Sequence, residues 1–288
     1  MTTGAGLHRV LVGYGGDDRS RDAVRLGAAL AEAAGAELHI GLVLRAGAAS
    51  GVTYPPVGDI TGIITDQGRR WLAEAEELVP AGIAAQTHLV ADRSVAEGML
   101  GLIGTTSADV VVTGSGVGTG RRSLHPTVDA LLHSSPVPVA LSPRGFDGES
   151  PISEVLVAVA EDSPVHQVVG RGADWAAQLG VSLTPTTLRT DQERPARSED
   201  RVTLAQTVAQ EAADRCEVTA ARIGVGRTVK RAVRSIDWPA GGVLLIGSSR
   251  LAGGPRTFLG ATAARLVAHL PIPLVVLPRT EAATDQAA

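Results

Sequence analysis

Short apolar runs alternate with stretches of helical periodicity along most of the 288 residues of the chain. The apolar runs predict strands at 9–14, 37–44, 83–90, 109–113, 137–142, 154–160, 181–188, 217–223, 242–246 and 272–277. The stretches between them predict helices at 18–34, 60–79, 94–105, 126–134, 164–179, 199–215, 228–237 and 257–269. Unbroken apolar strands that alternate with helices are typical of a parallel sheet covered by helices on both faces.

Two of the predicted helices show their apolar faces most clearly. The first has Ala23, Leu26, Leu30 and Ala33 along one face, and the second has Val165, Val168, Gly172, Ala176 and Leu179 along the matching face. Ser163 and Pro164 favour the start of the second helix. Gly35 and Gly180 are expected to end the two helices, because glycine adopts the left-handed conformation found after a last helical turn.

The chain repeats this pattern once. The segment Val10-Leu-Val-Gly-Tyr14 returns as Val155-Leu-Val-Ala-Val159, and Pro136–Arg144 returns as Pro271–Arg279. A repeat of this length indicates a duplicated domain rather than a solenoid unit. We therefore expect an α/β protein of two tandem doubly wound domains, at 1–147 and 151–280. They are joined by the turn-rich residues 145–151 and followed by a disordered tail at 281–288.

Composition narrows the class of protein. Hydrophobic residues make up 44% of the chain but aromatic residues only 2%, so aliphatic side chains must build the cores. A net charge of −4 argues against non-specific binding to nucleic acid or to a membrane surface. Cys216 is the single cysteine, which excludes an intramolecular disulfide. The sequence offers no signal peptide and no apolar run long enough to span a bilayer, so we expect a soluble cytoplasmic protein.

The order of the motifs resembles the universal stress protein family. In both halves an opening strand of the Val10-Leu-Val type precedes a helix that leaves through Gly-Ala-x-Leu or a similar segment. An apolar strand ending in Gly-Ser follows, and then a final Pro-Val-Pro-Val strand. The resemblance covers nearly the whole chain as a tandem arrangement. It implies a five-stranded sheet in each domain and pairing of the two domains through their last strands, and it leaves a homodimer open.

The resemblance also implies a site for ATP or another adenine nucleotide. Many members bind ATP through a loop of the form G-x-x-G, nine residues, then G-S/T, with an acidic residue after the first strand. In the second half the matching positions are Ala160, Gly247, Ser248, Ser249, Arg250, Gly253, Gly260, Ala261 and Thr262. Arg250 replaces the second glycine and Ala160 the acidic residue, so Arg250 would supply charge to the phosphates.

The first half departs further from that motif. Its matching positions are Gly15, Gly114, Ser115, Gly118 and Gly120, with Gly15 in the place of the acidic residue. Val117 stands at the second glycine, and His125-Pro126 replace the final pair. Proline has no N–H to donate to phosphate, so the sequence predicts that the second half is the nucleotide-binding half.

Three functions remain open on these residues. The chain is a nucleotide-binding module, an interaction protein that acts through its paired domains, or a slow ATPase, for which no positioned base or nucleophile is visible. No metal site is predicted, since the histidines lack ligand spacing. His39 and His88 fall in predicted strands and are interpreted as structural residues. Asp17-Asp18 follow the first strand, where they either cap the next helix or hold Mg²⁺.

Overall fold

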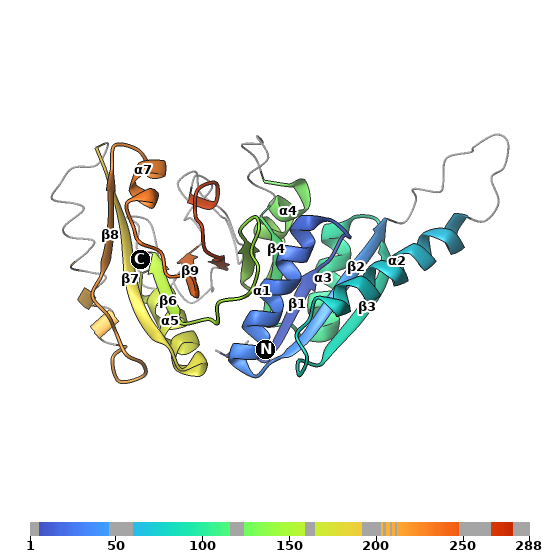
Figure 1. Ribbon diagram of the computed structural model, residues 1–288, viewed down its shortest axis with the longest axis horizontal. Helices are drawn as coiled ribbons and strands as arrows, with labels where there is room; N and C mark the ends of the chain where they lie inside the picture. The colour runs from blue at the N-terminus through green and yellow to red at the C-terminus, as the bar shows by residue number, and fades with distance from the viewer. Residues whose placement is uncertain are drawn as a thin grey trace, which may run out of the picture.

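The computed structural model of the chain describes residues 6–45, 60–115, 124–158, 165–191, 212–247 and 266–278, together with 203, 206, 207, 209 and 210. These residues form an elongated α/β molecule in which the two halves lie end to end (Figure 1).

One continuous sheet of ten strands runs through both halves. The first half contributes β1 (Arg9–Gly13), β2 (Glu37–Arg45), β3 (Ala85–Asp92), β4 (Val110–Gly114) and β5 (Val139–Ser142). The second contributes β6 (Glu154–Ala158), β7 (Ser182–Thr190), β8 (Arg222–Gly226), β9 (Gly242–Gly247) and β10 (Leu274–Leu277). Their order is β3-β2-β1-β4-β5-β10-β9-β6-β7-β8. Strands within each half are parallel, which confirms the predicted fold class.

Helices cover both faces of the sheet. The described helices are α1 (Asp18–Ala34), α2 (Ile60–Glu77), α3 (Val95–Thr106), α4 (Pro126–Ser134), α5 (Val165–Leu179) and α7 (Val229–Arg234). Buried side chains of α1, α2 and α5 pack with one face, and those of α3, α4 and α7 pack with the other. Gly35 and Gly180 follow α1 and α5 in the left-handed conformation, with φ of 62° and 65°, as the sequence predicts.

The predicted element boundaries agree with the structure within a few residues, with one exception. The strand expected at 217–223 is wrong, because β8 begins at Arg222 and residue Val218 makes only an isolated bridge to Leu183. Gly224 lies inside β8, which pairs with β7 over Arg222–Gly226, and a Cβ on Gly224 would collide with the carbonyl oxygen of Ala232 in α7. Of the helix expected at 199–215, the described residues up to 210 are helical and 212–215 form turns, while the helix expected at 257–269 falls largely outside the described residues.

The two halves join through their last strands. β5 pairs with β10 antiparallel, with Val139 opposite Val276, Ala140 opposite Val275 and Leu141 opposite Leu274. All the residues of both strands are buried. The two sheets therefore share one set of backbone hydrogen bonds at the centre of the molecule.

A glutamine side chain adds a second connection. Gln178 of α5 accepts a hydrogen bond from the Leu7 N–H through Oε1 at 2.7 Å, and its Nε2 donates to the Leu7 carbonyl at 2.7 Å. The same Nε2 lies 3.3 Å from the carbonyl oxygen of Ala34, near the end of α1. Gln178 of the second half thus bonds to the residue that precedes β1 by two positions and to the last residue of α1.

We predict that Gln178→Ala lowers the free energy of unfolding by about 1–3 kcal/mol, because it leaves the part-buried polar groups of Leu7 without protein partners. Urea unfolding followed by circular dichroism measures this change. Gln67→Ala is the matched control, since Gln67 only accepts an exposed hydrogen bond from Arg70 within α2. Equal losses in the two variants would contradict the connecting role of Gln178.

Candidate functional site

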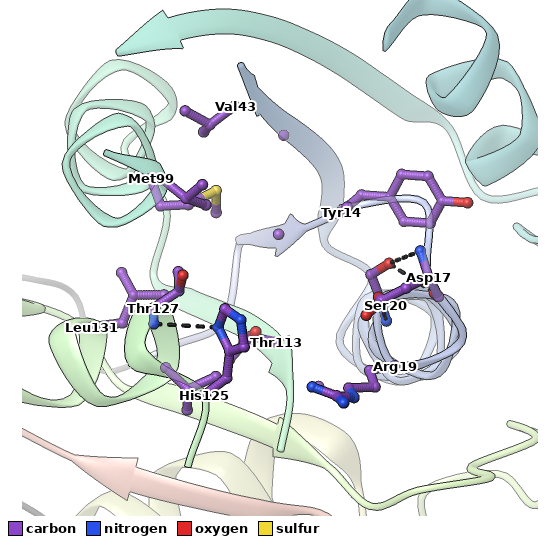
Figure 2. Close-up of a pocket in the computed structure, with 16 residues that line it drawn as sticks. Tyr14, Asp17, Arg19, Ser20, Val43, Met99, Thr113, His125, Thr127 and Leu131 are labelled. Atoms are coloured by element: carbon purple, nitrogen blue, oxygen red, sulfur yellow. Dashed lines mark hydrogen bonds between the residues drawn. The ribbon is translucent and has the colours of Figure 1, made fainter. Parts of the chain in front are cut away.

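A cavity of about 280 Å³ opens at the carboxyl ends of β1 and β4 (Figure 2). These two strands are neighbours in the sheet, while the chain leaves β1 toward β2 on the other side. This is the switch point of a doubly wound sheet, where open α/β sheets bind their ligands. The fold therefore places the cavity where a ligand is expected.

One wall of the cavity is apolar. It is made by the side chains of Val43, Val95, Met99, Val128 and Leu131, which come from β2, α3 and α4. In Figure 2, Val43 and Met99 lie together on one side of the hollow. Such a wall suits a flat apolar ring better than a hydrated ion.

The turn after β1 closes the opposite side. Asp17 caps α1 by accepting a hydrogen bond from the Ser20 N–H at 2.9 Å, and its own N–H donates to Ser20 Oγ at 3.1 Å. This capping box confirms the interpretation of Asp17 as a helix cap. Among the described residues, no group of three or more acidic, histidine or cysteine side chains converges to hold a metal ion.

The start of α4 forms the third side, and it offers few hydrogen-bond donors. His125 is the N-cap, and its Nδ1 accepts the Thr127 N–H at 3.3 Å. Pro126 follows as the first helical residue and has no N–H. Helix starts bind anions through free N–H groups, and here one of these groups is missing and the next is already engaged.

Arg19 supplies the positive charge of the site. It is the only arginine or lysine among the described residues that line the cavity. In Figure 2 it extends from the first turn of α1 toward the side where His125 lies. An anionic group entering between α1 and α4 would meet this guanidinium.

The structure brings together only some of the residues predicted from the sequence. Gly15 and Gly114 line the cavity. Ser115 is buried beside it and donates its N–H to the Ser142 carbonyl at 3.1 Å. A Cβ on Gly114 would lie 2.5 Å from the carbonyl oxygen of Arg19, so the close approach of α1 already requires this glycine.

Of the remaining predicted residues, the structure describes only Gly247. Gly247 ends β9, while Ala160, Ser248, Ser249, Arg250, Gly253, Gly260, Ala261 and Thr262 lie outside the described residues, as do Gly118 and Gly120. The sequence interpretation also missed Arg19, Gly41 and Met99, which line the cavity. Gly41 carried a signal, since a glycine inside an apolar strand marks a close approach, and its Cβ would lie 2.5 Å from Leu102 Cδ1.

Comparison with known proteins agrees with this doubly wound fold. Residues 6–143 match the family model described as the universal stress protein family. Universal stress proteins of Mycobacterium tuberculosis and Mycobacterium bovis are 28% identical over 215 residues, which cover 68% of this chain and 73% of each relative. The first half of the chain, residues 6–143, belongs to the universal stress protein family.

Solved structures extend the likeness to the second half. The crystal structure of a universal stress protein from Archaeoglobus fulgidus is 16% identical and covers 94% of this chain and 98% of its own, with a TM-score of 0.66. The crystal structure of a putative universal stress protein from Pseudomonas aeruginosa is 14% identical to this chain. It covers 95% of this chain and 94% of its own, with a TM-score of 0.57. At these identities the likeness establishes a common fold. Over the described residues, no helix has the length and apolar character that crossing a membrane requires.

The turn after β1 gives a prediction about the stability of the protein. Gly16 has a φ of 75°, and a Cβ there would lie 2.9 Å from the Trp71 ring. Gly16→Ala is expected to lower the free energy of unfolding by about 1–3 kcal/mol through backbone strain and this contact.

Thermal and urea unfolding measure that loss, and the neighbouring glycine provides the control. A Cβ on Gly15 would meet no atom within 4 Å, and this residue does not have a positive φ. Gly15→Ala should therefore change the stability by less than about 0.5 kcal/mol. A Gly16→Ala protein as stable as the Gly15→Ala protein would contradict the strained turn.

Proposed function

We propose that this protein is a nucleoside-binding regulatory module whose first half takes an adenine nucleoside into the cavity at the ends of β1 and β4. The observation that carries the proposal is a cavity of about 280 Å³ at the switch point, apolar on one wall and polar on the others. A flat base fits against Val43 and Met99, and the polar turn after β1 suits a ribose. Family membership favours adenine among flat heterocycles.

The size and charges of the cavity favour a nucleoside over a triphosphate. At about 280 Å³ the cavity is near the lower end of the roughly 300–1,000 Å³ usual for ligand pockets, which is enough for a base and a ribose. Phosphates would lie toward the start of α4, where, among the described residues, Pro126 has no N–H and the Thr127 N–H is already engaged. Asp17 adds negative charge at the cavity, and Arg19 opposes it. We therefore expect phosphates to add little affinity.

Isothermal titration of the full-length protein with adenosine, AMP, ADP and ATP tests this preference. The affinity should not increase by more than a few fold from adenosine to ATP. Pro126→Ser restores an N–H at the first turn of α4, and one charge-assisted hydrogen bond of about 1.5–3 kcal/mol should raise ATP affinity about ten- to a hundredfold. Adenosine affinity should stay unchanged in this variant. ATP binding much tighter than adenosine in the unmodified protein would contradict the preference.

Gly15→Leu tests the location of the site. A side chain there enters open space at the cavity, since a Cβ on Gly15 meets no atom within 4 Å. Leucine should occupy the space of the ligand and reduce adenosine affinity at least about a hundredfold, while the thermal midpoint changes little. Gly101→Leu is the control, because Gly101 lies exposed on α3 with the same open space around its Cβ.

The same titration distinguishes the two halves and the alternative function. Binding that survives Gly15→Leu would belong to the second half, where the sequence predicts a nucleotide loop around Arg250. Undetectable binding of all four ligands at millimolar concentration would favour an interaction protein instead. The continuous sheet through β5 and β10 would then be its supporting structure.

A further inference from the structure

Two histidines face each other across the outer strands of the first half. His39 lies on β2 and His88 on β3, which is an edge strand of the sheet. Nδ1 of His39 is 3.0 Å from Nε2 of His88, and the ring centroids are 5.2 Å apart. Only 5% of His39 is exposed. At this distance one neutral ring donates a hydrogen bond to the other, which joins the side chains of the two strands.

The pair lies on the face of the sheet that α3 covers. His39 and Gly41 share that face because side chains alternate along a strand, and a Cβ on Gly41 would lie close to Leu102 and Met99 of α3. Gly41 is also the register partner of His88 and lines the cavity described above. The pair is therefore adjacent to Gly41, the residue of β2 that lines the cavity.

Few charges surround the pair. On β2, the Glu37 carboxylate lies 3.7 Å from His39 Nε2, but the same oxygen already pairs with Arg9 of β1 at 3.1 Å. On β3 and α3 the other ionisable side chains are Asp92 and Glu97, which belong to the opposite end of these elements. His39 Nε2 is buried and makes no hydrogen bond to any residue that the structure describes.

The environment of the pair opposes protonation. Burial lowers the pKa of both imidazoles, and the neighbouring ring lowers the pKa of His39 further, against a smaller raising effect of Glu37. One added proton still leaves a donor facing an acceptor. A second proton would turn two N–H groups toward each other at 3.0 Å and bring two positive charges together.

We propose that His39 and His88 form an acid-sensitive clasp, which fastens the edge strand β3 to β2 at neutral pH and releases it when both rings take up protons. Because these histidines resist protonation in the folded state, the unfolded chain binds protons more readily as the pH falls below about 6.5. The stabilisation is complete above this value and is lost on acidification. This inference does not depend on which ligand the cavity binds.

The pH dependence of unfolding of the full-length protein tests the clasp. Below about pH 6.5 each histidine should raise the unfolding equilibrium constant by up to about tenfold per pH unit, and the two together by up to about a hundredfold. The double variant His39→Asn, His88→Gln should lose this dependence. The new amides offer polar atoms close to the original Nδ1 and Nε2, but they do not titrate. His8→Gln is the control, since His8 is exposed.

Hydrogen exchange locates the opening. In the unmodified protein, the protection of the β3 amides should fall at acid pH relative to the protection of β4, and in the double variant the ratio should stay constant. An unfolding profile with the same pH dependence in the unmodified protein and in the double variant would overturn the proposal. So would acid opening that affects β3 and β4 equally. If the double variant does not fold, His88→Gln alone provides the same comparison, with half the change in pH dependence.

Discussion

The pairing of β5 with β10 is the constraint on which the rest of the molecule depends. Each half is a parallel sheet whose last strand is short, apolar and completely buried. Alone, such a strand would expose unpaired backbone groups and aliphatic side chains to water. Antiparallel pairing of β5 with β10 gives these backbone groups hydrogen-bond partners and buries the aliphatic side chains. It leaves β3 and β8 as the edges of the described sheet. Gln178 then fixes α5 against the start of β1, so the halves have little freedom to move apart.

The duplicated halves differ at a buried polar position next to their first strands. Leu38 of β2 and Leu183 of β7 hold equivalent places opposite Val10 and Val155, so the next residues, His39 and Thr184, are equivalent. In the first half this position joins a pair of imidazoles. In the second it bonds to Glu154, which also forms an ion pair with Arg222 at 2.9 Å. The aliphatic framework is kept, while each half satisfies its buried polar groups in its own way.

The candidate site depends on how closely α1 and α4 approach the sheet. Gly114 allows the first turn of α1 to lie against the end of β4, and this brings Arg19 to the rim of the cavity. His125 caps α4 and uses the N–H of Thr127 that a phosphate would otherwise bind. Helix packing therefore positions the charge of Arg19, and helix capping decides which N–H groups are free. The glycines of the loop motif alone do not define the site.

The sequence by itself determined the fold class, the internal repeat and most strand and helix boundaries. Apolar periodicity and glycine stops are local properties, so Gly35 and Gly180 could be recognised as helix ends without a structure. The resemblance to the family motif also indicated Gly15 and Gly114, and both line the cavity at the carboxyl edge of the sheet.

Only the tertiary structure decided the features that join distant segments. The limits of β8 follow from its pairing with β7 over Arg222–Gly226, which no periodicity in residues 217–223 reveals. Met99 and Arg19 line one cavity although they are far apart in the sequence, and the 3.0 Å contact of His39 with His88 depends on the register of β2 and β3. These contacts are non-local, and their geometry is fixed by packing between elements rather than by the preferences of any single segment.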